Sequence, residues 1–297
     1  MFELLLAGIL FGGITTGARF LAGFRLSLYE ISFFTLGLGT LMLAPLALKE
    51  KTSTGKLKFL ALYGLSGALL QLAGFAGIIL QVPVAIVSFF MYSQPIWTVF
   101  LSILFLKEKI DARKVLAVFS AIAGVAVLAN LASAGNYNVW GTISPLIGGF
   151  LLAVWVVGGR KISLEKESTS FVTFAYCGFT TLWLILIYPL LRILVPQPMF
   201  SNLSFNHSAT VWLNLLWIVL VSRVASNWFF YRGMKKVEAS RAGIVVLVEP
   251  ISVALISAFA FSQPITTTLA IGGGLILFAN YLITFGQQNN QKKKVSA

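Results

Sequence analysis

Apolar segments about 20 residues long recur along almost the whole chain, separated by short polar stretches. A helix of roughly 20 apolar residues is long enough to cross the ~30 Å hydrocarbon layer of a membrane. These segments are continuously apolar and do not alternate, which excludes the strands of a membrane β-barrel. Only 10% of the 297 residues are charged, whereas soluble domains carry roughly 25%. The sequence therefore predicts an all-α integral membrane protein whose surface faces mainly the lipid bilayer.

Polar residues divide the apolar sequence into ten expected transmembrane helices. We place them at residues 3–24, 28–48, 57–80, 83–106, 112–131, 139–159, 170–195, 210–234, 239–261 and 265–286. The first segment occupies the position of a secretory signal, but it opens with Glu3 and lacks the basic residues that begin such a signal. We therefore expect it to be retained as a membrane span.

Basic residues fall mainly in loops that would share one face of the membrane. Eighteen of the 22 Lys and Arg residues lie there: Lys49, Lys51, Lys56, Lys58, Lys107, Lys109, Arg113, Lys114, Arg160, Lys161, Lys166, Arg232, Lys235, Lys236, Arg241, Lys292, Lys293 and Lys294. Arg25 and Arg192 lie on the opposite face, and Arg19 and Arg223 lie within spans. Because an excess of Lys and Arg marks cytoplasmic loops, both termini are expected in the cytoplasm. The net charge of +13 then reflects topology, and no nucleic-acid partner is expected.

The two halves of the chain resemble each other. A shift of 155 residues aligns Gln94-Pro95-Ile96 with Glu249-Pro250-Ile251 without gaps, so that a proline falls within a span of each half. With five spans per half, the second half must cross the membrane in the opposite orientation. We therefore expect two inverted-topology five-helix repeats, residues 1–134 and residues 135–297 with a basic cytoplasmic tail. Such repeats are typical of transporters with a substrate site near mid-membrane; an old duplication in a receptor or membrane enzyme is the alternative.

Short motifs in both halves resemble those of a known family. The first half has Gln94-Pro95-Ile96, Phe105-Leu106-Lys107-Glu108 and Ala123-Gly124, and the second has Glu249-Pro250-Ile251, Phe261-Ser262-Gln263 and Gly272-Gly273-Gly274. They resemble the drug/metabolite transporter superfamily, specifically its ten-span EamA-type branch, over essentially the whole chain. The resemblance implies export of small metabolites from the bacterial cytoplasm across the inner membrane. Gln263 replaces the acid that usually closes the fourth span of each repeat.

Two ionisable residues lie near the middle of consecutive spans, Arg223 in the eighth and Glu249 in the ninth. A charge at this depth costs at least ~2.5 kcal/mol on insertion scales, so such residues normally face inward and are often functional. The two groups could form a structural ion pair, or they could bind a substrate or a proton. Proton-coupled transport and facilitated diffusion are both open.

Other polar and aromatic side chains are candidates for the same central site. Asn227 lies one helical turn beyond Arg223, and the two could hold a carboxylate together. Gln94 is the counterpart of Glu249 in the first half. Further candidates for substrate binding are Gln71, Tyr92, Trp155 and Trp228, and the candidates for gating are Pro95 and Pro250. An interhelical hydrogen bond is the alternative for Gln71, and packing or interface anchoring is the alternative for the aromatic residues.

The sequence contains no phosphate-binding loop, zinc spacing or convincing nucleophile–base pair, so no cofactor or metal is expected and an enzyme is disfavoured. Cys177 is expected to be a small apolar side chain in a helix, and His207 a solvated loop residue. The leading hypothesis is a monomeric secondary transporter or facilitator that moves small organic metabolites, such as amino acids or amphipathic compounds, by alternating access. A carrier of sugar-nucleotide or lipid-linked substrates, and less so a membrane-embedded enzyme, are the alternatives.

Overall fold

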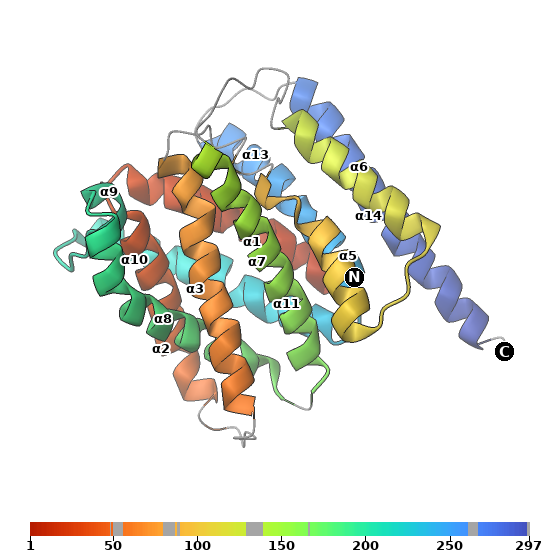
Figure 1. Ribbon diagram of the computed structural model, residues 1–297, viewed down its shortest axis with the longest axis horizontal. Helices are drawn as coiled ribbons and strands as arrows, with labels where there is room; N and C mark the ends of the chain where they lie inside the picture. The colour runs from red at the N-terminus through yellow and green to blue at the C-terminus, as the bar shows by residue number, and fades with distance from the viewer. Residues whose placement is uncertain are drawn as a thin grey trace.

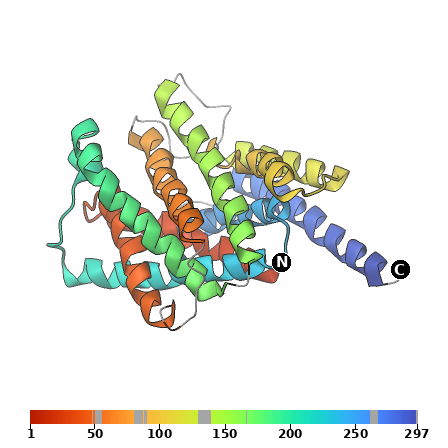
Figure 2. The ribbon, with the colours of Figure 1, turned by 60° about the horizontal axis from the view of Figure 1, so that its bottom comes forward.

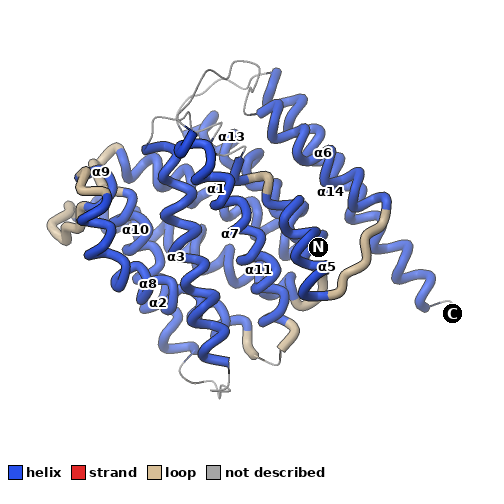
Figure 3. The backbone as a smooth tube through the Cα atoms, viewed as in Figure 1, coloured by secondary structure: helices blue, strands red, loops and turns tan. Residues whose placement is uncertain are grey.

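The chain folds into a bundle of helices. The computed structural model describes residues 1–47, 49, 56–79, 87, 90–128, 139–165, 167–260 and 267–295, and within these ranges every regular element is helical (Figure 1 and Figure 3). In chain order these are α1 (Phe2–Ala22), α2 (Leu28–Ala47), α3 (Leu57–Ile79), α5 (Gln94–Leu106), α6 (Ala112–Leu128), α7 (Val139–Ser163), α8 (Thr169–Leu194), α9 (Pro198–Ser201), α10 (Ala209–Ile218), η3 (Val219–Ala225), α11 (Ser226–Met234), α12 (Ala239–Val245), η4 (Val246–Val248), α13 (Glu249–Ala260) and α14 (Thr267–Val295). The predicted all-α class is confirmed for this part of the chain. Gln263, noted above for its place in the second-half motif, lies outside the described residues.

Six segments of the described chain are long and apolar enough to cross a membrane. They are Leu28–Ala47, Leu57–Gly74, Val139–Ser163, Thr169–Leu194, Ala209–Met234 and Ala239–Ala260. Phe2–Ala18, Gln94–Leu106 and Ala270–Ile283 are shorter apolar helices. The chain is thus a multi-pass membrane protein, and the count of ten spans stays a prediction.

Three places interrupt regular α-helix within the apolar segments. Between α10 and α11 the chain forms the π-helical segment η3, and between α12 and α13 it forms the 3₁₀ turn η4. A turn at residues 92–93 precedes α5. In the first half Gln94-Pro95 opens α5, and in the second half Glu249-Pro250 opens α13. Proline suits the first turn of a helix because its missing N–H needs no partner there.

Helices of the first half are interleaved with helices of the second half. α1 packs against α11 and α13, α2 packs against α8, and α3 packs between α7 and α8. α6 pairs with α14 along one side of the bundle, and the C-terminal end of α14 extends beyond it (Figure 1 and Figure 2). The two halves therefore share one core and do not form separate bundles.

Small residues allow these helices to approach closely. A Cβ added to Gly12 of α1 would lie 2.8 Å from Ser252 Oγ of α13, and the same hydroxyl donates a hydrogen bond to the Ile9 carbonyl at 2.8 Å. A Cβ on Gly124 of α6 would lie 2.6 Å from the Gly272 carbonyl oxygen of α14. Close backbone approach of this kind strengthens helix packing in membranes, where no hydrophobic force drives helices together.

Loops that the sequence assigns to one membrane face contact one another. Lys56 Nζ lies 3.0 Å from Glu165 Oε2, and Lys236 Nζ lies 2.9 Å from Glu3 Oε1. We call this the basic face; it includes residues 107–111, 160–165 and 235–238. On the opposite face, Ser27 Oγ donates a hydrogen bond to the Asn202 carbonyl at 2.6 Å. The cytoplasmic placement of the basic face stays a prediction.

Candidate functional site

Arg223 is buried where the second half of the chain meets the first. It lies in η3 with 5% of its surface exposed, and its Nη2 donates to Thr35 Oγ1 of α2 at 3.3 Å. The titratable groups that interact with it electrostatically are Tyr176 and Cys177 of α8 and Glu249 of α13. The guanidinium is thus held among α2, α8 and α13, in a segment whose hydrophobic neighbours provide little solvation.

Two polar side chains next to Arg223 bond to the backbone of the same segment. The Ser226 hydroxyl donates to the Ser222 carbonyl, and Asn227 Nδ2 donates to the Arg223 carbonyl at 2.7 Å. Among the described residues, Arg223 Nε and Asn227 Oδ1 are both buried without a hydrogen-bond partner. Arg223 Nε is a donor and Asn227 Oδ1 is an acceptor. The pair therefore presents complementary groups, one for an anion and one for an amine or hydroxyl.

Glu249 lies beside the break in the first half of the chain. It is the first residue of α13, after η4, and its side chain hydrogen-bonds with the hydroxyl of Tyr92, in the turn before α5. The interruptions next to Pro95 and Pro250 are therefore in contact through these two side chains. Glu249 also interacts electrostatically with Arg223, so the two predicted ionisable residues influence each other within the bundle.

The two predicted glutamines lie in different surroundings. Gln94 is fully buried, and its Nε2 donates to Thr98 Oγ1 one turn along α5. A Cβ on Gly243 of α12 would lie 2.5 Å from Gln94 Nε2, so Gln94 lies against α12. Gln71 is half-buried on α3. We find no contact between Gln71 and the Arg223 group among the described side chains.

The two predicted tryptophans have different environments. Trp155 is buried and stacks on Phe230 with ring centroids 4.0 Å apart. Its carbonyl accepts a hydrogen bond from the Tyr63 hydroxyl at 2.8 Å. Trp228 is half-buried, and the guanidinium of Arg232 lies 4.9 Å from its ring centroid. Core packing accounts for the position of Trp155, and contact with an exposed cation near the basic face accounts for that of Trp228.

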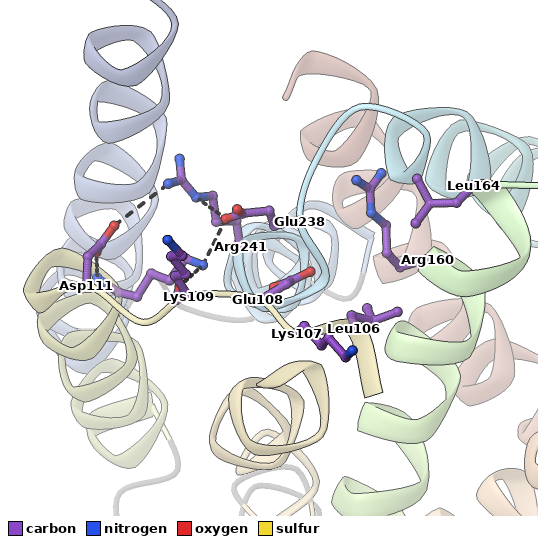
Figure 4. A pocket seen from close by; sticks show the side chains of 10 residues that line it. Leu106, Lys107, Glu108, Lys109, Asp111, Arg160, Leu164, Glu238 and Arg241 are labelled. Atoms are coloured by element: carbon purple, nitrogen blue, oxygen red, sulfur yellow. Dashed lines mark hydrogen bonds and ion pairs between the residues drawn. The ribbon is translucent and has the colours of Figure 1, made fainter. Parts of the chain in front are cut away.

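A polar cavity of about 410 Å³ opens at the basic face. It is lined by Leu106, Lys107, Glu108, Lys109, Asp111, Lys114, Arg160, Leu164, Glu238 and Arg241 (Figure 4). Glu238 Oε2 lies 2.8 Å from Lys114 Nζ and 2.9 Å from Arg241 Nε. Arg241 Nη2 also lies 3.8 Å from Asp111 Oδ2. These ion pairs join the loop after α5 and the first turn of α6 to the residues around the start of α12.

Glu30 is a buried acid that the sequence analysis did not single out. It is fully buried and accepts hydrogen bonds from the Ser27 N–H at 2.6 Å and the Ser204 N–H at 2.7 Å. The Ser27 hydroxyl in turn accepts from the Glu30 N–H at 2.9 Å. This is a capping box at the start of α2, and the Ser-x-x-Glu spacing of residues 27–30 is the signal that could have revealed it.

The expectation that His207 is a solvated loop residue is wrong. Only 12% of its side chain is exposed, and its Nε2 lies 3.5 Å from Glu30 Oε1. Its ring also contacts Phe34 and Trp212. The loop folds back over the start of α2 because the buried carboxylate there accepts hydrogen bonds from that loop.

Comparison with known proteins agrees with this architecture. An uncharacterized transporter of Archaeoglobus fulgidus is 25% identical over 275 residues, which cover 92% of this chain and 92% of that protein. The uncharacterized transporter YetK of Bacillus subtilis is 28% identical over 177 residues, which cover 58% of this chain and 51% of YetK. One protein crystal structure superimposes with a TM-score of 0.78 at 17% identity and 97% coverage of both chains. At that identity the superposition shows the fold alone.

Family membership rests on a match that covers most of the chain. The sequence model of the EamA-like transporter family matches residues 1–130 and 139–285. The helical bundle, the apolar segments and the transporter relatives are all consistent with that match. The chain therefore belongs to the EamA-like transporter family and is a multi-pass membrane protein that transports small molecules.

Proposed function

We propose that this protein exports small zwitterionic metabolites, with amino acids as the leading class, by alternating access through a site centred on Arg223. The observation that carries the proposal is the buried pair of Arg223 Nε and Asn227 Oδ1, which lack hydrogen-bond partners among the described residues. A guanidinium can bind a carboxylate through two hydrogen bonds, and an amide oxygen accepts from an ammonium group. One amino-acid backbone supplies both groups.

We further propose ten membrane spans arranged as two inverted five-helix repeats, residues 1–134 and 135–297. The matching positions of Gln94-Pro95 and Glu249-Pro250, each at the start of a helix after a break, support this arrangement. The contact between Tyr92 and Glu249 brings the two breaks together. A central site at broken helices between repeats is the arrangement expected of such transporters.

The proposed location is the inner membrane of a bacterium, with both termini in the cytoplasm and a single chain in the lipid bilayer as the working unit. The distribution of Lys and Arg supports the orientation, and the contacts between loops on the basic face support the grouping of those loops. Glu249 would carry the proton if transport is coupled to a pH gradient; facilitated diffusion would need no such step.

The test is flux of radiolabelled amino acids into liposomes that contain purified protein, with and without a pH gradient. Arg223→Lys should lower flux at least tenfold, because Lys keeps the charge but loses the planar fork that binds a carboxylate. Arg192→Lys is the matched control, since Arg192 lies in the last turn of α8, away from the Arg223 site, and donates to the Ser201 carbonyl at 3.5 Å. Equal flux in both variants would contradict the proposed site.

Coupling is tested in the same liposomes with Glu249→Gln. In a proton-coupled transporter, wild type accumulates substrate with the gradient, whereas Glu249→Gln exchanges substrate without accumulating it. If flux through the wild-type protein is saturable but does not depend on the pH gradient, the protein is a facilitator. Absence of flux for every amino acid would reject the proposed substrate class, and sugar-nucleotide and lipid-linked substrates would then be assayed.

A further inference from the structure

α12 is a short helix of the second half that is enclosed at the basic face. All seven of its residues, Ala239–Val245, are buried, and it packs against α5 and α6 of the first half as well as α7 and α14. It is separated from α13 by η4. A 3₁₀ turn within a helical segment often marks a hinge. α12 is thus a buried half-helix connected to the rest of its span by an irregular turn.

The start of α12 is capped by a residue of the other half. No side chain of its own N-cap residue, Glu238, caps it. Instead Glu108 Oε1 accepts from the Ala239 N–H at 2.6 Å, and Glu108 Oε2 accepts from the Ser240 N–H at 3.1 Å and the Ser240 hydroxyl at 2.5 Å. The first N–H groups of a helix have no partner within it, so this carboxylate satisfies donors that would otherwise be buried unpaired.

Ion pairs reinforce the same contact. Lys114, with 2% of its side chain exposed, pairs with Glu238 at 2.8 Å and donates to the Lys109 carbonyl at 2.7 Å. Glu238 also pairs with Arg241 of α12 at 2.9 Å. The close view shows Glu238 and Arg241 beside Glu108, with a dashed line from Arg241 to Asp111 (Figure 4). The loop after α5 is therefore attached to α12 through both hydrogen bonds and charges.

The body of α12 lies directly on α5 near the start of the latter helix. A Cβ added to Gly243 would lie 2.5 Å from Gln94 Nε2 and 3.1 Å from Thr98 Cγ2. Gln94 and Thr98 are both fully buried. α12 therefore packs on α5 between the basic face and the level of Gln94.

We propose that Glu108 is the latch of a gate formed by α12: the gate is closed while Glu108 caps α12, and it opens toward the basic face when α12 moves about η4 and leaves that cap. Here the carboxylate acts across the two halves, so that its hydrogen bonds break when the halves separate at this face. This role rests on the proposed alternating-access function. It adds a positioning residue outside the Arg223 site that sets how readily the basic face opens.

The test measures access to a buried position without using any substrate. Thr98→Cys is introduced as a reporter beneath α12, and membrane vesicles with the basic face outward are treated with an impermeant thiol reagent. The native Cys177 is fully buried, and protein without the reporter measures its background labelling. Adding Glu108→Ala should raise the labelling rate of residue 98 about tenfold, because α12 loses three hydrogen bonds to a charged acceptor.

The matched control is Glu165→Ala. Glu165 is an acid on the same face that also pairs across the halves, with Lys56 at 3.0 Å, but it lines neither α12 nor the cavity beside it. Glu108→Gln should give an intermediate labelling rate, since its amide oxygen still accepts from an α12 N–H. Equal labelling with Glu108→Ala and Glu165→Ala would overturn the latch, as would a rise in both.

A second arm locks the gate. Glu108→Cys and Ser240→Cys are added to the Thr98→Cys reporter and treated with a short bis-methanethiosulfonate reagent. The cross-link should lower labelling of position 98 to the rate of the Thr98→Cys protein with Glu108 intact, and it should stop flux until a reductant is added. A labelling rate that does not change on cross-linking would overturn the proposal. This measurement also tests the proposal if the Glu108→Ala variant fails to fold. Labelling needs no substrate, so the gate and the substrate are tested separately. If labelling supports the latch but no amino acid is transported, the proposed substrate class is wrong and the proposed gate stands.

Discussion

At the scale of single residues, the two ionisable side chains expected near the middle of the membrane lie where the α-helix is interrupted. Arg223 lies within a π-helical segment, and Glu249 directly follows a 3₁₀ turn. π-helical and 3₁₀ interruptions of this kind occur frequently at functional sites. In a membrane this irregular backbone is tolerated only inside the protein or beside a cavity, which is where a substrate site is expected.

Gly39 of α2 should tolerate alanine but not a large side chain. A Cβ there would lie 3.7 Å from Cys177 Sγ and 3.8 Å from Arg223 Cγ, which is ordinary contact. Gly39→Ala is therefore expected to keep or slightly raise the melting temperature of the purified protein and to keep flux. Gly39→Leu should displace the Arg223 stem and raise the KM for substrate. A KM unchanged by leucine would show that Arg223 can move without loss of binding.

Glu30 should contribute strongly to stability. Glu30→Gln places an amide where the carboxylate accepts from the Ser27 and Ser204 N–H groups, so at least one buried donor loses its partner at a cost of about 2–3 kcal/mol. The melting temperature of the purified protein should fall by several degrees. Glu165→Gln, at an exposed ion pair, should change it little. A similar melting temperature for both variants would contradict this role.

At the scale of helices, the sequence predicted where elements lie better than how they are built. The expected spans agree with most described helix bounds within a few residues, because apolar length alone determines them. Runs of apolar residues carry no signal for a π segment or a 3₁₀ turn, so η3 and η4 were not predicted. The last expected span ends at residue 286, and the helix α14 that contains it continues to Val295.

Side-chain partners were also beyond prediction, because they depend on which helices meet. Arg223 and Glu249 were recognised because a charged side chain is costly in lipid. The cap that Glu108 provides for α12 could not be predicted, since Glu108 and Ala239 are 131 residues apart in the sequence. The predicted site residues are brought together only in part: Tyr92 meets Glu249, whereas Trp155 packs in the aromatic core.

The crossing of α6 and α14 provides a matched pair of substitutions. A Cβ on Gly124 would lie 2.6 Å from the Gly272 carbonyl oxygen, whereas a Cβ on Gly274 would meet no atom within 4 Å. Gly124→Ala must push the two backbones apart and should lower the melting temperature by several degrees. Gly274→Ala should leave it unchanged or slightly higher. If both variants melt like wild type, the close crossing does not contribute to stability.

At the scale of the whole molecule, the two halves form one core. α1 contacts α11 and α13, and α3 contacts α7 and α8, so each half covers much of the other. Such interleaving makes a shared interface the natural place for a route through the protein. It also means that a change at that interface, such as the release of α12, involves both halves at once.

Separately expressed halves should depend on each other. Residues 1–134 and 135–297 are each expected to be degraded when made alone, since small residues of α1 such as Gly12 would lack the α13 surface that they contact. Expressed together, the two fragments should co-purify in one complex. The amounts of each fragment in the membrane, with and without its partner, provide the measurement. A half that accumulates alone at full level would show that the shared core is not required.

The cap on α12 also has a consequence for the order in which the protein is made. Glu108 leaves the ribosome 131 residues before the Ala239 N–H that it will accept from, an interval of about 7 to 26 s at a synthesis rate of 5–20 residues per second. Throughout that time the carboxylate must remain at the water interface, and α1 must wait in lipid without α13. The contacts that hold the two halves together therefore form late, once α12 and α13 have been synthesised.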